Sequence, residues 1–197
     1  MNVTTIVFAT NNAHKLEEIR SILGEGYRVL GLKDIGCSED IPETAATLEG
    51  NAEQKARYVK EHYGYDCFAD DTGLFVEALG GEPGVYSARY AGPEHDSSAN
   101  MRKLLEAMEG VDESDRRAYF KTVIACVRGS VLTLHEGRVD GMIATGPSGN
   151  DGFGYDPVFM PDGCGGRTFA MMSPEEKNSI SHRGRATARF MVYLKEQ

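Results

Sequence analysis

The chain has 197 residues, of which 41% are hydrophobic and 26% charged, as in an ordinary soluble globular protein. This length suits a single domain over residues 1–197, or two lobes that share one core. The formal net charge of −9 argues against broad nucleic-acid binding, and no run approaches the roughly 18 apolar residues of a membrane span. We therefore expect neither a nucleic-acid partner nor a membrane segment.

The first third of the chain predicts an α/β protein. Val3–Ala9 is rich in β-branched residues and indicates a buried strand, and residues 27–32 predict a second one. Between them, the apolar residues Leu16, Ile19 and Leu23 recur at helical spacing and predict a helix. Gly24 and Gly26 are expected to end it. The N-terminus has no basic region or cleavable small-residue site, so a cytoplasmic location is expected.

The middle of the chain predicts a loop, a helix and a strand. Ile35–Leu48 is acidic and indicates a loop, and residues 48–64 predict a helix that ends at Gly64. Residues 65–71 predict a third strand that stops at two aspartates, and residues 73–79 are expected to continue the sheet.

The second half begins with an irregular loop at Gly80–Pro93 and a helix through residues 101–108. Ala118–Val127 and Val131–Glu136 predict a hairpin, and residues 138–145 a further strand. Gly146–Pro157 is a glycine-rich loop. Residues 173–186 lead into a last helix with Ala186, Phe190, Tyr193 and Leu194 on one face, and Ser173 as N-cap with Glu176 at N3 predicts a helix start through a capping box. The four cysteines form no C-x-x-C pair, so neither a zinc site nor a disulfide framework is expected.

Thr10–Lys15, "TNNAHK", joins a strand end to a helix start. Unpaired N–H groups and the helix dipole favour an anion there, and Lys15 adds a positive charge. An asparagine-rich turn with an N-cap explains the same residues without a ligand.

Asp70 and Asp71 are adjacent acids at the predicted end of a buried strand. Neighbouring strand residues point to opposite faces, so one carboxylate is expected to hold the loop while the other faces a site. Two uncompensated carboxylates repel each other, and Mg²⁺ removes that cost. From spacing alone, the second carboxylate ligand is Glu43 or one of its rivals Glu39, Asp40 and Glu49.

Two later stretches contain groups suited to a flat, polar ligand. In "GFGYDP", Phe153 can stack on a base and Asp156 can accept a hydrogen bond from a ring N–H, although a Gly-Pro turn with an aromatic plug is the alternative. In "SHRGRA", His182 and Arg183 are donors suited to carbonyl or phosphate oxygens, with a solvated basic patch as the alternative.

Taken in order, "FATNNAHK", "ADDTGLFVEALGGEPGVYSARYAG", "GFGYDP" and "EEKNSISHRGRA" closely resemble the Ham1/RdgB/inosine triphosphatase family. The resemblance runs from the first strand to the last helix. It implies an elongated mixed α/β sheet with flanking helices that form two lobes around a central substrate cleft, in a homodimer. It further implies Mg²⁺-dependent hydrolysis of ITP, dITP and XTP to the monophosphate and pyrophosphate, which removes deaminated purines from the nucleotide pool.

The resemblance also implies roles for individual residues. Asp71 matches the proton acceptor and magnesium ligand, and Glu43 the further metal ligand. "LEGNA" departs from the family pattern at the start of the second helix, which leaves Glu49 as an alternative to Glu43. Thr72 stands where serine is commoner and keeps the hydroxyl. The substrate contacts carried over are Thr10, Asn11, Asn12, Ala13, His14, Lys15, Lys55, Thr72, Phe153, Gly154, Tyr155, Asp156, Lys177, His182 and Arg183.

Base selection follows from hydrogen-bond polarity. Inosine and xanthine carry a 6-oxo acceptor where adenine has an amine, so His182 and Arg183 as donors are expected to reject ATP. Two other functions remain open from the sequence: a pyrophosphatase for modified pyrimidine or other purine triphosphates, and a catalytically silent nucleotide-binding protein.

Overall fold

The computed structural model describes residues 3–196 and has a mixed α/β fold. Its seven-stranded sheet has the order β2-β1-β3-β5-β6-β7, and β4 pairs with β3. The chain divides into two compact units. The first unit comprises Met1–Asp71, Val123–Glu136 and Ala186–Gln197, and the second comprises Thr72–Thr122 and Gly137–Arg185. The single-domain organisation expected from the length stays a prediction.

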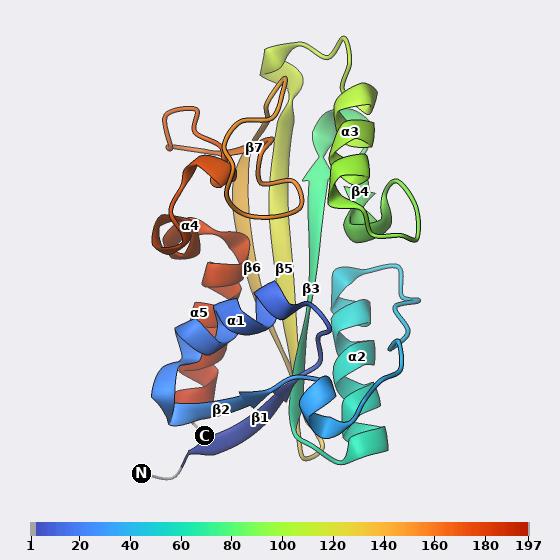
Figure 1. The fold of residues 1–197 in the computed structure, drawn as a ribbon, viewed down its shortest axis with the longest axis vertical. Helices are drawn as coiled ribbons and strands as arrows, with labels where there is room; N and C mark the ends of the chain where they lie inside the picture. The colour runs from blue at the N-terminus through green and yellow to red at the C-terminus, as the bar shows by residue number, and fades with distance from the viewer. Residues whose placement is uncertain (1–2, 197) are drawn as a thin grey trace. The chain divides into compact units, whose positions relative to one another are not determined.

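The first unit is built on parallel strands with helices on both faces. β1 (Thr4–Phe8) lies between β2 (Tyr27–Leu30) and β3 (Cys67–Val76) and is parallel to both. Figure 1 shows α1 (Ala13–Leu23) and α5 (His182–Lys195) on one side of these strands, and α2 (Leu48–Tyr63) on the other.

Alternate residues of the strands form two separate cores, because successive strand side chains point to opposite faces. Ile6, Phe8 and Phe68 pack with α1 and α5. Val7, Cys67 and Ala69 pack against Ala52, Ala56 and Val59 of α2. The same alternation continues along β3, so even-numbered and odd-numbered residues after Ala69 are expected to face opposite sides of the sheet.

The second unit has one hydrophobic core of its own. β5 (Arg117–Arg128) and β6 (Val131–Ile143) run through both units, while β4 (Pro83–Gly84) and β7 (Phe159–Pro161) pair antiparallel with β3 and β6. α3 (Ser97–Ala107) and α4 (Pro174–Ile180) complete the unit. The core includes Leu74, Leu104, Phe120, Phe159 and Phe169.

Most predicted elements are present, but three predicted boundaries are wrong. β3 does not stop at Asp70 and Asp71; it continues as one strand to Val76. β6 runs without a break through Gly137, where two strands were expected. The last helical segment is two helices, because Ser181 takes an extended conformation between α4 and α5.

The glycine-rich and acidic loops lie where the sequence predicts them, and only β4 and the short 3₁₀ turn Ser87–Arg89 interrupt residues 80–93. The sheet expected over residues 73–79 ends at Val76, and Glu77–Leu79 is a 3₁₀ turn. Ser173 and Glu176 form the predicted capping box at the start of α4. Within residues 3–196, no helix is both long and apolar enough to cross a membrane.

Candidate active site

The loop after β1 ends at the N-terminus of α1. Asn12 is the N-cap: its side chain accepts from the Lys15 N–H at 3.2 Å, and its own N–H donates to the Thr10 hydroxyl at 3.1 Å. Thr10 is half-buried, whereas residues 11–14 are exposed. The turn expected as the alternative is therefore present, and it exposes the helix N-terminus that suits an anion.

Asp70 and Asp71 point to opposite faces of β3, as their adjacency predicts. Asp70 is 2% exposed and lies on the α1 face, where it accepts from Lys15 Nζ at 2.9 Å. Asp71 lies on the α2 face and accepts from Asn51 Nδ2 at 3.1 Å. Asp70 therefore anchors the lysine of the β1–α1 loop, and Asp71 faces a different set of groups.

Asp71 belongs to a group of charges that we call the carboxylate–lysine cluster: Lys15, Glu43, Lys55, Asp70 and Asp71. Lys55, on α2, forms a short ion pair with Glu43. Burial alone would lower the pKa of Lys55, but the carboxylates of Asp71, Glu43 and Asp70 raise it above its usual value. Lys55 is therefore held in its charged form.

The pKa of Asp71 is raised, chiefly because burial disfavours its charged form. The negative charge of Glu43 raises it further, while Lys55, Lys15 and the hydrogen bond from Asn51 lower it. Additional positive charge beside Asp71 would favour its charged form.

A divalent cation fits the donor set of this cluster. Glu43 and Asp71 provide carboxylate oxygens, and a cation would offset their mutual repulsion. In the described part of the chain, no three His, Cys, Asp or Glu side chains form a metal site by themselves. Mg²⁺ commonly takes one or two protein carboxylates and completes its shell with substrate phosphates and water, so two suffice here.

Glu39, one rival of Glu43, is engaged elsewhere. Its carboxylate accepts from the Tyr58 and Tyr63 hydroxyls at 3.1 and 2.9 Å. Glu43, in contrast, pairs with Lys55 and acts on the pKa of Asp71. The geometry therefore favours Glu43 over Glu39.

The second unit contains another group, which we call the aromatic–basic cluster: Thr72, Phe153, Asp156, Lys177, His182 and Arg183. The ammonium of Lys177 lies 4.7 Å from the Phe153 ring centroid, and the guanidinium carbon of Arg183 lies 5.4 Å from it. One aromatic ring thus has two cations close to it.

Asp156 holds the Phe153 loop in place. Its Oδ2 atom accepts from Lys177 Nζ at 2.7 Å and from the Phe153 N–H at 2.8 Å. Asp156 is 3% exposed, and a Cβ on Gly152 would lie 2.2 Å from its Oδ2, so glycine is required beside it. The observed role of Asp156 is structural, whereas contact with a base N–H stays a prediction.

Tyr155 has its side chain in the core. It is 5% exposed, packs in the second unit's hydrophobic cluster and donates its hydroxyl proton to the Ser87 carbonyl at 2.7 Å. Only the backbone of Tyr155 is left to meet a ligand. Phe153 and Gly154 are half-buried, as a ligand-facing loop requires.

His182 and Arg183 begin α5 and are nearly fully buried, which argues against a solvated basic patch. The His182 ring stacks on Phe120 with centroids 4.5 Å apart, and Arg183 Nη2 donates to the Thr72 hydroxyl at 3.4 Å. Thr72 in turn shares a 2.8 Å hydrogen bond with Thr122. Thr122 and Asn51 could not be singled out from the sequence, since both act through another side chain.

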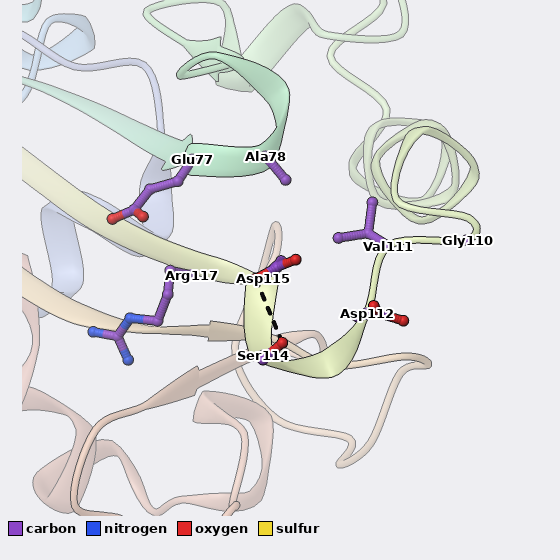
Figure 2. A pocket seen from close by; sticks show the side chains of 8 residues that line it. All are labelled: Glu77, Ala78, Gly110, Val111, Asp112, Ser114, Asp115 and Arg117. Atoms are coloured by element: carbon purple, nitrogen blue, oxygen red, sulfur yellow. Dashed lines mark hydrogen bonds between the residues drawn. The ribbon is translucent and has the colours of Figure 1, made fainter.

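Figure 2 shows a different pocket of the second unit, about 520 Å³ in volume. It contains none of the predicted site residues. Its charged lining is Glu77, Asp112, Asp115 and Arg117, and the Arg117 guanidinium is already bound by both carboxylate oxygens of Asp162. This acidic lining does not suit a triphosphate.

Residues 6–193 match the sequence profile of the Ham1 family. The chain belongs to the Ham1 family. It is 53% identical over 190 residues to the dITP/XTP pyrophosphatase of Flavobacterium psychrophilum, covering 96% of this chain and 98% of that protein.

Solved structures of Ham1 proteins have the same fold. The Staphylococcus aureus Ham1 protein is 38% identical with a TM-score of 0.89, and covers 98% of this chain and 99% of its own. The Ham1 protein of Coxiella burnetii is 38% identical with a TM-score of 0.90, covering 99% of this chain and 100% of its own. The predicted mixed α/β fold of this family is thereby confirmed.

Proposed function

We propose that this Ham1 family member hydrolyses the deaminated purine nucleotides ITP, dITP and XTP to the monophosphate and pyrophosphate. The observation that carries the proposal is the carboxylate–lysine cluster beside an exposed helix N-terminus, a combination suited to a bound polyphosphate. The names of curated relatives, such as the dITP/XTP pyrophosphatase of Flavobacterium psychrophilum, support the same activity.

The first unit supplies the groups for the triphosphate. The N–H groups at the start of α1 and the ammonium groups of Lys15 and Lys55 bind phosphate oxygens. Each lysine is paired with a carboxylate, Lys15 with Asp70 and Lys55 with Glu43, so its position is fixed before the substrate arrives. Fixed positive charges stabilise the leaving pyrophosphate without having to reorganise.

Asp71 and Glu43 would hold Mg²⁺, which when bound supplies charge neutralisation at the phosphates and at the two carboxylates. Asp71 then orients the attacking water through its carboxylate, and the proton that the water loses passes to Asp71 or to solvent. The water oxygen bonds to the α phosphorus as the bond from that phosphorus to the oxygen shared with the β phosphate breaks. Pyrophosphate leaves with the electron pair of the broken bond. With a divalent cation bound beside it, Asp71 would be a weak base, so Asp71 serves chiefly to position the water.

The second unit supplies the groups for the base. Phe153 offers a ring face for stacking, while His182 and Arg183 donate toward the 6-oxo oxygen of hypoxanthine or xanthine. Adenine presents an amine at that position and would leave these donors without an acceptor, at a cost of about 1–3 kcal/mol each. The burial of His182 and Arg183 supports this assignment, because desolvated donors discriminate most strongly.

Product analysis tests the proposal. ITP, XTP, dITP, ATP and GTP are each incubated at equal concentration with the full chain and with Asp71→Asn, with and without Mg²⁺. We expect pyrophosphate and monophosphate from the deaminated purines alone, only in Mg²⁺, with Asp71→Asn losing the activity. Comparable turnover of ATP or GTP would contradict the specificity, and preferred turnover of a modified pyrimidine triphosphate would identify the alternative substrate class. No pyrophosphate from any nucleotide would indicate a silent binding protein.

Two further expectations come from the resemblance to the family. We propose a homodimer, for which light scattering on the purified chain would give twice the 21.5 kDa of one copy. We also propose a cytoplasmic location, since the proposed substrates belong to the pool that polymerases use; cell fractionation tests it.

A further inference from the structure

Asn51 is a buried side chain that joins two parts of the carboxylate–lysine cluster. It lies in the first half of α2 and is 0% exposed. Its Nδ2 donates to Asp71 Oδ2 at 3.1 Å, and its Oδ1 accepts from the Ala45 N–H at 2.9 Å. One amide group therefore bonds both Asp71 and the segment that contains Glu43.

Helix α2 holds the segment Glu43–Ala45 through three consecutive residues of that segment. Lys55 binds the Glu43 carboxylate, Gln54 accepts from the Thr44 N–H at 3.0 Å, and Asn51 accepts from the Ala45 N–H. A Cβ at Gly50 would lie 2.6 Å from the Cβ of Ala45, so this close approach depends on glycine. The segment has no helix or strand of its own, and α2 determines its path.

Of these three contacts, only the one through Asn51 continues to Asp71. A carboxamide is the right group for this position, because it donates and accepts at once and carries no charge. Lysine would add a charge between the carboxylates, and a carboxylate would repel Asp71. Lys55, Glu43 and Lys15 act on the charge of Asp71, while Asn51 donates a directional hydrogen bond to one of its oxygens.

We propose that Asn51 is a positioning residue of the active site, which sets the orientation of Asp71 relative to Glu43 and so prepares the pair for a divalent cation. The proposal rests on the proposed function, since it assigns Mg²⁺ to these two carboxylates. Asn51 touches neither the cation nor the substrate. It acts through two hydrogen bonds, and its removal leaves Asp71 and Glu43 themselves in the chain.

Asn51→Ala tests the proposal, with Gln54→Ala as the matched control. Both changes shorten an amide side chain on α2 and both release the segment Glu43–Ala45 at one residue. Only the first also releases Asp71. The affinity of a non-hydrolysable ITP analogue with an imido bridge between the α and β phosphates is measured by calorimetry, once in EDTA and once in Mg²⁺.

We expect wild type and both variants to bind the analogue equally in EDTA. Mg²⁺ should raise the affinity of wild type and of Gln54→Ala for the analogue by the same factor. In Asn51→Ala that factor should be smaller by roughly ten-fold or more, which is the effect of losing one hydrogen bond to a charged group. The Mg²⁺ concentration for half-maximal ITP hydrolysis rises in Asn51→Ala alone. If Asn51→Ala only reduced the fraction of folded protein, the Mg²⁺-dependent gain in affinity and the half-maximal Mg²⁺ concentration would both stay unchanged. The two measurements therefore distinguish a positioning role from a merely structural one.

An unchanged Mg²⁺-dependent gain in Asn51→Ala, or an equal loss in both variants, would overturn the proposal. Asn51→Ser, whose hydroxyl is too short to bridge Asp71 and Ala45, serves as the second variant if alanine prevents folding. Failure of the proposed function appears separately, as a wild type that does not hydrolyse ITP or gains no affinity from Mg²⁺.

Discussion

Replacing Asp156 by asparagine measures how much the buried ion pair with Lys177 contributes to stability. The two charged atoms lie 2.7 Å apart, and the side chains are only 4% and 9% exposed. Neutralising Asp156 leaves the Lys177 ammonium buried without its counter-charge, which typically costs about 3–5 kcal/mol. In a chain of this size, about 1 kcal/mol lowers Tm by roughly 2–4 °C, so a drop of roughly 6–20 °C is expected.

The matched control is Asp162→Asn, which breaks an exposed ion pair in the same unit. Asp162 lies 2.8 Å from Arg117, but the side chains are 52% and 39% exposed, and such pairs contribute about 1 kcal/mol or less. Thermal unfolding of both variants at pH 7 gives the comparison. Adding Lys177→Met to Asp156→Asn restores part of the loss, because no unpaired charge then stays buried. Equal drops for Asp156→Asn and Asp162→Asn would refute the reasoning.

Three other changes test separate parts of the structure. Arg183→Ala should reduce the preference for ITP over ATP in kcat/KM by roughly 5- to 150-fold, the loss of one desolvated donor; an unchanged ratio would remove Arg183 from base selection. Burial lowers the pKa of His135, so the unfolded chain binds its proton first and stability is lost as pH falls through about 6.5. His135→Gln should therefore lose less Tm than wild type between pH 7.5 and 5.5, and parallel curves would contradict this. Gly184→Ala places a Cβ 1.9 Å from the Asn178 carbonyl oxygen and should lower Tm strongly, whereas Gly146→Ala, with open space around it, should not; similar Tm values would contradict the tight contact.

The sequence predicts the parts of this fold that depend on local pattern. β1, α1 and α2 follow from β-branched runs, 3.6-residue spacing and glycine caps, and the capping box at Ser173 starts α4 where expected. Adjacent placement alone was also enough to predict that Asp70 and Asp71 face opposite sides of β3.

The wrong boundaries occur where tertiary contacts override local signals. Two aspartates look like a strand end, yet β3 continues because Lys15 compensates Asp70 and because Asn51 and Lys55 offset Asp71. A glycine in β6 looks like a break, but the strand continues through it. Local pattern contains no information about such distant partners.

The same limit applies to the site. Lys15, Glu43 and Phe153 could be picked from the loops and the helix start that contain them, because those residue types suggest a ligand. Lys55 and Lys177 lie within α2 and α4, and only the resemblance to the family indicates them. Asn51 and Thr122 could not be picked, since each reaches the site through a hydrogen bond to a side chain far away in the sequence, Asn51 to Asp71 and Thr122 to Thr72. Tyr155 shows the reverse case, a residue in a ligand-like loop whose side chain is used by the core.

The position of the broken phosphate bond tests the central claim most directly. Phosphorus NMR of ITP incubated with the full chain and Mg²⁺ distinguishes the two possible cleavages in one spectrum. The account predicts that IMP and pyrophosphate appear in equal amounts and that neither appears with Asp71→Asn. Formation of IDP and orthophosphate would contradict it, because the bond between the β and γ phosphates would then be the one that breaks.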